Sequence, residues 1–190
     1  MHDLIIKNGT VVDGTGSPRK LSDIAITDGI ICEVGKISDC AKRTINAENK
    51  LITPGWVDIH THYDGQATWD PYLTPSSWHG VTTCVFGNCG VGFAPVKKGS
   101  ENYLINLMEG VEDIPESVLS EGIDFSWESF PEYLNALESS KRIMDIGTQV
   151  PHSALRFFVM GEDGANHLSK PNEKQISTMT TLLEEALLSG

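Results

Sequence analysis

The sequence predicts an α/β protein with two regions, a small all-β region over residues 1–54 and an alternating strand and helix region over residues 55–190. Two observations lead to this prediction. Short β-branched runs separated by turn residues fill the first region. Three further apolar runs in the second region are separated by segments whose apolar residues recur every three or four positions, the period of a helix. Such alternation is typical of a parallel sheet covered by helices.

In the first region, strands are predicted over residues 4–8, 23–27 and 30–35. The dipeptide Asp28-Gly29 joins the last two, and it is a typical two-residue turn of a β-hairpin. In the second region, strands are predicted over three ranges, which are 55–60, 82–87 and 144–150. Each of these three is followed closely by a histidine or a cysteine, and functional groups gather where parallel strands end.

Helices are predicted after Ser100 and after Ser129, because serine is a good helix cap and apolar residues follow at helical spacing. A third helix is predicted between Asn172 and Ser189, where apolar residues share one helical face. The first helix is expected to end at Gly110. The acidic run over residues 109–116 is interpreted as a solvent-exposed loop, and the alternative is a loop over the mouth of a barrel that also meets substrate. These helices are expected to cover the sheet.

His60 and His62 are the first candidate metal ligands. On a strand, residues i and i+2 lie on the same side, so the two imidazoles can point at one ion. Imidazole binds Zn²⁺ and related divalent metals, which acidify water and polarise carbonyl groups in hydrolytic sites. The alternative is a pair of structural histidines. The position of the pair at a strand end, before a glycine-containing loop, favours metal.

Cys89 is a third candidate, because the glycines around it allow the backbone to present its sulfur and a thiolate binds zinc strongly. Cys84 lies inside a β-branched run and is predicted to pack as a small buried hydrophobe. His152 follows the third predicted strand, where it either contacts substrate or shapes the turn at Pro151. Asp64 either orients a metal ligand from behind or caps the loop.

These motifs resemble the metal-dependent amidohydrolases, and within them the N-acyl-D-amino-acid deacylases, or D-aminoacylases. The resemblance extends over nearly the whole chain. The blocks that carry it are Pro54-Gly55-Trp56-Val57-Asp58-Ile59-His60-Thr61-His62, Gly87-Asn88-Cys89-Gly90, Met108-Glu109-Gly110-Val111-Glu112-Asp113-Ile114-Pro115 and Val150-Pro151-His152-Ser153-Ala154-Leu155-Arg156. The second and third blocks point to the D-aminoacylase branch.

The resemblance implies that His60, His62 and Cys89 bind one or two divalent metal ions, with zinc expected. It implies a fold in which a small incomplete β-sandwich precedes part of a TIM-type (β/α)8 barrel, about its first three βα units. Residues 55–190 are well short of the roughly 250 that a complete barrel takes. The family's further histidine ligands and its general-base aspartate are therefore expected beyond Gly190, and no catalytic residue is assigned within the chain.

The resemblance implies hydrolysis of N-acyl-D-amino acids to a carboxylate and the free D-amino acid, with this stretch of chain inactive alone. The alternatives are a cyclic amidohydrolase of the hydantoinase or dihydroorotase type, which Cys89 argues against, and a noncatalytic metal-binding remnant. The formal net charge of −12 argues against nucleic acid or an anionic membrane as partner, so the expected partner is a small N-acyl amino acid. Unpaired cysteine spacing and a start without a signal-peptide pattern lead us to expect a cytoplasmic protein.

Overall fold

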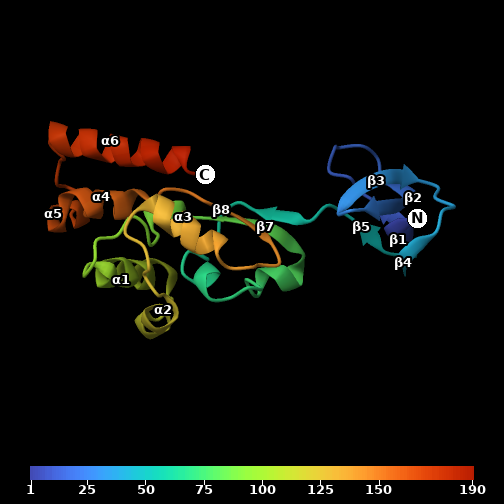
Figure 1. Cartoon of the computed structure of the whole chain (residues 1–190), viewed down its shortest axis with the longest axis horizontal. Helices are drawn as coiled ribbons and strands as arrows, with labels where there is room; N and C mark the ends of the chain where they lie inside the picture. Colours follow the sequence, from blue (N-terminus) through green and yellow to red (C-terminus); the bar gives the residue numbers. More distant parts are fainter. The chain divides into compact units, whose positions relative to one another are not determined.

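The computed structural model describes residues 1–190, and the chain divides into two compact units, Met1–Gly55 and Trp56–Gly190. Both contain a β-sheet, and all the α-helices belong to the second unit (Figure 1). The α/β class predicted from the sequence is confirmed. No helix is long and apolar enough to cross a bilayer.

The first unit is a five-stranded sheet in which the order β3-β2-β1-β4 is completed by β5 beside β1. The strands are β1 His2–Val11, β2 Lys20–Thr27, β3 Ile30–Gly35, β4 Ala41–Asn46 and β5 Leu51–Ile52. The predicted hairpin joins β2 to β3, since Asp28 and Gly29 both have positive φ, 51° and 75°. Ile5, Ala25 and Ile37 form its small core. Strands β4 and β5 were not predicted from the sequence.

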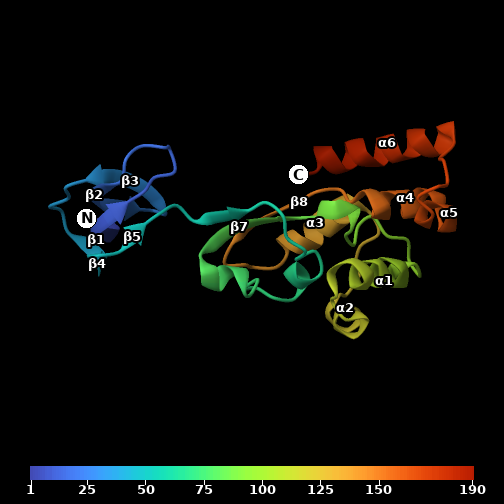
Figure 2. The same cartoon turned by 180° about the vertical axis from the view of Figure 1, so that it is seen from behind.

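The second unit has a three-stranded parallel sheet in the order β6-β7-β8. The strands are β6 Trp56–Asp58, β7 Val81–Phe86 and β8 Asp145–Thr148. The α-helices are α1 Glu101–Glu112, α2 Glu116–Gly122, α3 Phe130–Glu138, α4 His152–Met160, α5 Glu162–Ala165 and α6 Glu173–Leu188. Short 3₁₀ turns are formed by Gln66–Thr68, Ser76–His79 and Asn88–Gly90. Helices α4 and α6 pack together near the end of the chain (Figures 1 and 2).

Of the two serine caps predicted from the sequence, Ser129 is confirmed, whereas Ser100 makes no side-chain hydrogen bond to the first turn of α1. A further cap, at Asn172, was not predicted. Ser129 accepts a hydrogen bond from the backbone N–H of Glu132, whose side chain bonds back to the backbone of Ser129. Asn172 and Gln175 form the same reciprocal pair at the start of α6. Each pair satisfies N–H groups that have no partner within the helix, so the polar sequence itself determines where these helices start.

Several predicted boundaries are wrong. Strand β1 is longer than the predicted residues 4–8, and β8 ends at Thr148 and not at residue 150. Strand β6 ends at Asp58, so His60 and His62 lie in the loop that follows the strand and not on the strand itself. Helix α1 continues through Gly110 to Glu112 and ends at Asp113, which takes the left-handed conformation at φ 55°. The acidic run is therefore mostly helical. Burial of Leu104, Ile105 and Met108 against the core stabilises α1 enough to carry a glycine in its interior.

Candidate metal centre

The carboxyl ends of the three parallel strands place the candidate residues on one edge of the sheet. His60 and His62 follow β6, Cys89 follows β7, and His152 follows β8 as the first residue of α4. Because the strands are parallel and adjacent, groups that lie far apart in the sequence meet where the strands end.

His60, His62 and Cys89 form one cluster. Each offers a ligand atom, and these atoms all lie within 4.8 Å of one another. His60 Nε2 lies 3.0 Å from Cys89 Sγ, and the centroids of the two imidazole rings are 5.5 Å apart. The two histidines therefore lie close together, as their spacing predicted. The loop after β6, and not the strand itself, brings their imidazole rings near each other.

The loop that carries the histidines is bonded to the neighbouring strand. Thr61 is buried, and both its backbone N–H and its hydroxyl donate to the carbonyl of Val85 in β7, each at 2.9 Å. The backbone N–H of His60 donates to the carboxylate of Asp58 at 3.2 Å. These bonds fix the backbone between the two histidines, so their rings project from a rigid base.

Cys89 projects from a tight turn. Its own φ is 56°, a left-handed value that is uncommon outside glycine, and Gly87 and Gly90 beside it both have φ 78°. A side chain at Gly87 would overlap the backbone of Gln149, which follows β8. The turn therefore requires the glycines that led us to expect an accessible Cys89 sulfur. Cys84 is fully buried, as predicted.

The surroundings of His62 favour its neutral form, which is the form that binds metals. Burial lowers its pKa, the nearby carboxylate of Glu112 opposes this shift, and His60 adds to it. Its Nε2 lies 3.1 Å from Glu112 Oε1, and its Nδ1 is buried without a hydrogen-bond partner. The contact with Glu112 was not anticipated, although Glu112 belongs to one of the sequence blocks that carried the family resemblance.

Asp64 is a buried residue two positions after His62. Only 1% of it is exposed, and burial raises its pKa to about 7 although two backbone N–H groups act in the opposite direction. The hydroxyl of Tyr133 in α3 donates to the Asp64 backbone carbonyl at 2.7 Å. Asp64 Oδ2 has no hydrogen-bond partner. This residue anchors the end of the histidine loop in the core.

His152 is exposed and stands outside the cluster. It lies beside the turn of Cys89, because a Cβ added at Gly90 would be 3.6 Å from the Cβ of His152. The structure thus brings the end of β8 next to the end of β7 without adding His152 to the three grouped donors.

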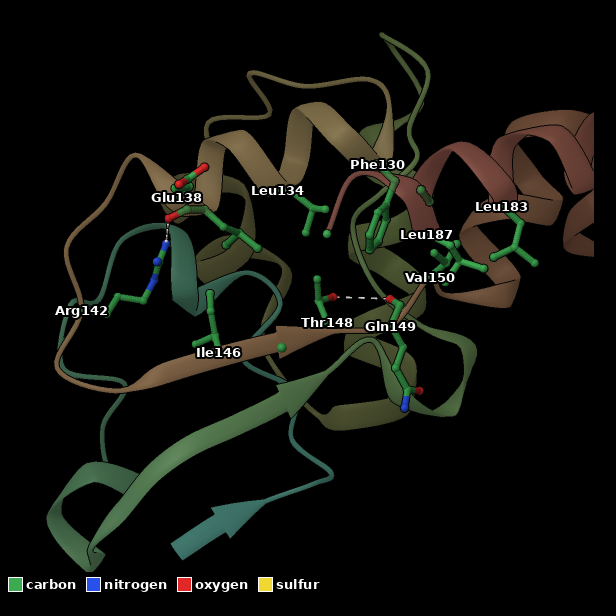
Figure 3. A pocket seen from close by; sticks show the side chains of 14 residues that line it. Phe130, Leu134, Glu138, Arg142, Ile146, Thr148, Gln149, Val150, Leu183 and Leu187 are labelled. Atoms are coloured by element: carbon green, nitrogen blue, oxygen red, sulfur yellow. Dashed lines mark hydrogen bonds between the residues drawn. The ribbon is translucent and has the colours of Figure 1, made fainter. Parts of the chain in front are cut away.

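A cavity that does not include the grouped donors lies between α3, β8 and α6. It has a volume of about 630 Å³, and Figure 3 shows Phe130, Leu134 and Leu187 directed into it. Neither histidine nor cysteine lines it. It runs along the edge of β8 that pairs with no other strand, so it reflects an open sheet edge and lies outside the metal cluster.

The three grouped donors fit a divalent transition metal. Two imidazoles and one thiol are a donor set that suits zinc, and three protein ligands are the number found in zinc sites that keep one position open. A neutral His62 requires no deprotonation before it binds. The parallel sheet and this cluster together define an α/β protein with a candidate metal centre of the hydrolase type.

Comparisons with known proteins identify the family. Residues 43–185 match the amidohydrolase family model, and the chain belongs to that family. It is 32% identical over 190 residues to D-aminoacylase of Alcaligenes xylosoxydans xylosoxydans, a match that covers 99% of this chain and 36% of the relative. It is 30% identical to the N-acyl-D-aspartate deacylase of the same organism, with 99% and 35% covered.

Comparison with solved structures leads to the same family. A crystal structure of D-aminoacylase matches with a TM-score of 0.82 and 33% identity over 100% of this chain and 37% of that chain. An N-acyl-D-glutamate deacylase from Bordetella bronchiseptica, complexed with zinc and a phosphonate inhibitor, matches with a TM-score of 0.76 and 27% identity over 98% and 36%. The predicted resemblance is confirmed, and the chain spans about a third of the length of the curated relatives it matches.

Proposed function

We propose that this chain forms part of a zinc-dependent amidohydrolase that hydrolyses N-acyl-D-amino acids to a carboxylate and the free D-amino acid. The observation that carries the proposal is the convergence of His60, His62 and Cys89 in a chain that resembles D-aminoacylase over its whole length. Zinc is favoured by the donor set and by the zinc-containing N-acyl-D-glutamate deacylase. A second metal position is consistent with the binuclear metal centre of D-aminoacylase.

In this proposal His60, His62 and Cys89 hold the metal, and His152 faces the substrate. A bound divalent metal supplies Lewis acidity and makes water more acidic. The chain contributes a neutral His62, a cysteine that binds as the thiolate, and a loop fixed by Thr61 that keeps the two imidazoles in place. Asp64 is not proposed as a proton carrier, because it is sealed from solvent.

We further infer that β6, β7 and β8 form an arc of a (β/α)8 barrel and that Met1–Gly55 belongs to a β-sandwich. The parallel order of the strands and the position of the cluster at their carboxyl ends support this. The groups that transfer a proton to the leaving nitrogen and bind the substrate carboxylate are not found among the grouped residues, so residues 1–190 alone are expected to bind metal without turnover.

A cyclic amidohydrolase is the second candidate. D-hydantoinase of Ralstonia pickettii is 38% identical, but over 88 residues that make up 46% of this chain. The deacylases match over 99% of it. Because the deacylase resemblance extends across both units, the linear N-acyl amide is the favoured substrate. A noncatalytic metal-binding protein is the remaining alternative.

Metal content tests the centre directly. The purified chain is loaded with Zn²⁺, freed of excess ion, and compared with a His60→Ala/His62→Ala double variant by elemental analysis. We expect at least one zinc per wild-type chain and a large loss in the double variant. Equal zinc content in the two proteins would refute the centre.

A chimera tests the substrate class. This chain replaces the corresponding N-terminal segment of D-aminoacylase, and release of amino acid is measured with N-acetyl-D-methionine, its L enantiomer and hydantoin. Hydrolysis of the D substrate alone supports the deacylase proposal. Hydrolysis of hydantoin in preference would favour the second candidate. Separately, turnover of N-acetyl-D-methionine by the 190 residues above the double variant would refute the expectation that they are inactive.

A further inference from the structure

A thiol, an imidazole and a carboxylate meet in the first unit, which contains none of the candidate metal ligands. Sγ of Cys32 lies 3.4 Å from Nδ1 of His2. Nε2 of the same imidazole lies 3.4 Å from Oδ2 of Asp39. His2 opens β1 and Cys32 lies in β3, and both strands pair with β2. The sheet therefore brings together three groups that are distant in the sequence.

An irregularity in β3 directs the side chain of Cys32. Ile31 pairs with Ile26 and Glu33 pairs with Ala25, so Cys32 is an extra residue between two consecutive pairs. Such a β-bulge turns a side chain away from the regular alternation of the strand. β3 is also an edge strand of its sheet, and Cys32 is exposed. A small molecule can therefore reach the sulfur.

Contacts on both sides hold the imidazole of His2. Only 15% of the His2 side chain is exposed, and its buried Nε2 has the Asp39 carboxylate as ion-pair partner but makes no hydrogen bond. A carboxylate beside Nε2 favours a proton on that nitrogen, which leaves Nδ1 free to accept one. The Thr27 hydroxyl lies 3.0 Å from Nδ1 and 3.6 Å from Sγ of Cys32. This hydroxyl can donate to the nitrogen or to the sulfur.

The three groups have the order of a nucleophile, a base and a group that orients the base. A shared metal ion does not fit them, because the sulfur and the carboxylate lie against opposite nitrogens of one ring. The simpler alternative is a thiol that only donates to the carbonyl of Ala25, 3.4 Å away. In that case His2 has no effect on the reactivity of Cys32.

We propose that Cys32 is a covalent modification site, where a small disulfide forms a mixed disulfide with the assistance of His2. The Cys32 thiol gives its proton to Nδ1 of His2, and its sulfur attacks one sulfur of the reagent. The new S–S bond forms as that of the reagent breaks, and the departing thiolate takes the proton from His2. Cys32 is oxidised to the disulfide, and half of the reagent is reduced to a free thiol. The site is independent of the metal centre.

Cystamine, a small disulfide with two cationic ends, is a suitable probe. Asp3, the other carboxylate near His2, is paired with Lys42 at 2.6 Å. The charge of Asp39 therefore has only the imidazole beside it, and the whole chain carries a formal net charge of −12. A cationic disulfide is attracted to such a site, whereas an anionic one is repelled.

Cys40 is the reference thiol within the same protein. It is exposed and belongs to the same unit as Cys32. Trypsin cleaves after Lys36, between the two cysteines, so mass spectrometry of the quenched peptides gives the rate for each thiol separately. The full chain is treated with cystamine at neutral pH, both folded and in concentrated urea.

Three variants isolate the roles of the neighbouring groups. His2→Asn places an amide atom near the position of Nδ1, but an amide does not accept the proton of a thiol. Asp39→Asn removes the charge beside Nε2. Glu48→Gln is the matched control, because it removes an exposed carboxylate elsewhere in the same unit. The ¹⁵N chemical shifts of the His2 ring report which nitrogen carries the proton.

We expect Cys32 to react at least about 10-fold faster than Cys40 in the folded chain and at a similar rate in urea. His2→Asn should slow Cys32 at least about 10-fold and leave Cys40 within about twofold. Asp39→Asn should slow Cys32 about two- to fivefold and shift the neutral ring from protonation on Nε2 to a mixture of tautomers. Glu48→Gln should match wild type in both measurements.

Equal rates for Cys32 and Cys40 in the folded wild-type chain would overturn the proposal. An unchanged Cys32 rate in His2→Asn would also overturn it, because exposure alone would then explain the reactivity. A wild-type ring protonated on Nδ1 when neutral would exclude His2 as the base. If His2→Asn slows both thiols equally, the variant has disturbed the sheet, and the wild-type rates and ring tautomer decide.

Discussion

Tyr133→Phe should destabilise the second unit measurably, because it removes one hydrogen bond between α3 and the end of the histidine loop. The Tyr133 hydroxyl donates to the backbone carbonyl of Asp64 at 2.7 Å, and both residues are 1% exposed. The phenylalanine ring keeps the packing of the tyrosine against Trp127, whose ring centroid is 4.9 Å away. The main cost is therefore a buried carbonyl without a partner, about 1–3 kcal/mol in the free energy of unfolding.

Urea unfolding followed by tryptophan fluorescence is a suitable assay. All four tryptophans lie in Trp56–Gly190, so the signal reports this unit alone. With an m-value of about 2 kcal/mol/M, a loss of about 2 kcal/mol lowers the urea midpoint by roughly 1 M. The control is Tyr72→Phe. Tyr72 is 58% exposed, so this substitution should change the free energy of unfolding by less than about 0.5 kcal/mol. Equal midpoints for Tyr133→Phe and wild type would refute the role of this hydrogen bond.

Three further predictions concern other parts of the second unit. Gly87→Ala should lower the Tm of the second unit strongly, because the φ of Gly87 is 78° and a side chain there would overlap the backbone of Gln149. Gly110→Ala should raise the free energy of unfolding by up to about 1 kcal/mol, because Gly110 lies in a helix with open space around it. A higher Tm for Gly87→Ala than for Gly110→Ala would contradict this prediction. The pKa of Asp70 is below its ordinary value, because hydrogen bonds from its own loop outweigh the effect of burial, so its stabilising effect is present above about pH 4 and is lost as pH falls through the lowered pKa. The Tm difference between wild type and Asp70→Asn should therefore shrink below pH 4, and a constant difference across pH 3–7 would exclude this linkage. Cys89→Ser should abolish the thiolate-to-metal charge-transfer band of the Co²⁺ form, while Cys40→Ser, in the first unit, should retain it; a band that survives in Cys89→Ser would remove this residue from the ligand set.

Sequence reasoning worked best where neighbouring residues decide the structure. The hairpin at Asp28-Gly29 depends on the positive φ of two adjacent residues, and the cap at Ser129 depends on a partner three residues away. The cap predicted at Ser100 is absent. The same reasoning was wrong about Gly110, because the burial of one face of α1 outweighs the weak helix propensity of glycine. It also extended the strand β6 too far, to His60.

In the candidate site, too, local patterns indicated some residues, whereas a contact between distant residues was missed. His60 and His62 lie close to each other and to Cys89, as expected, but they lie in a loop and not on the strand whose geometry led to that expectation. Glu112 was missed as a contact of His62 because 50 positions separate it from that residue, and it had been placed in a solvent-exposed loop. His152 was expected near the site, and it lies beside the Cys89 turn but outside the three donors.

The sequence by itself determined the α/β class, the local turns and caps, the types of donor that are available, and the membership of the amidohydrolase family. These properties depend on composition, on short spacings and on motifs that can be read along the chain. Only the tertiary structure decided that Glu112 faces His62 and that Tyr133 holds the backbone of Asp64. Such contacts join residues 50 and 69 positions apart, and they form because buried apolar faces fix the helices α1 and α3 against the core, which no local pattern specifies.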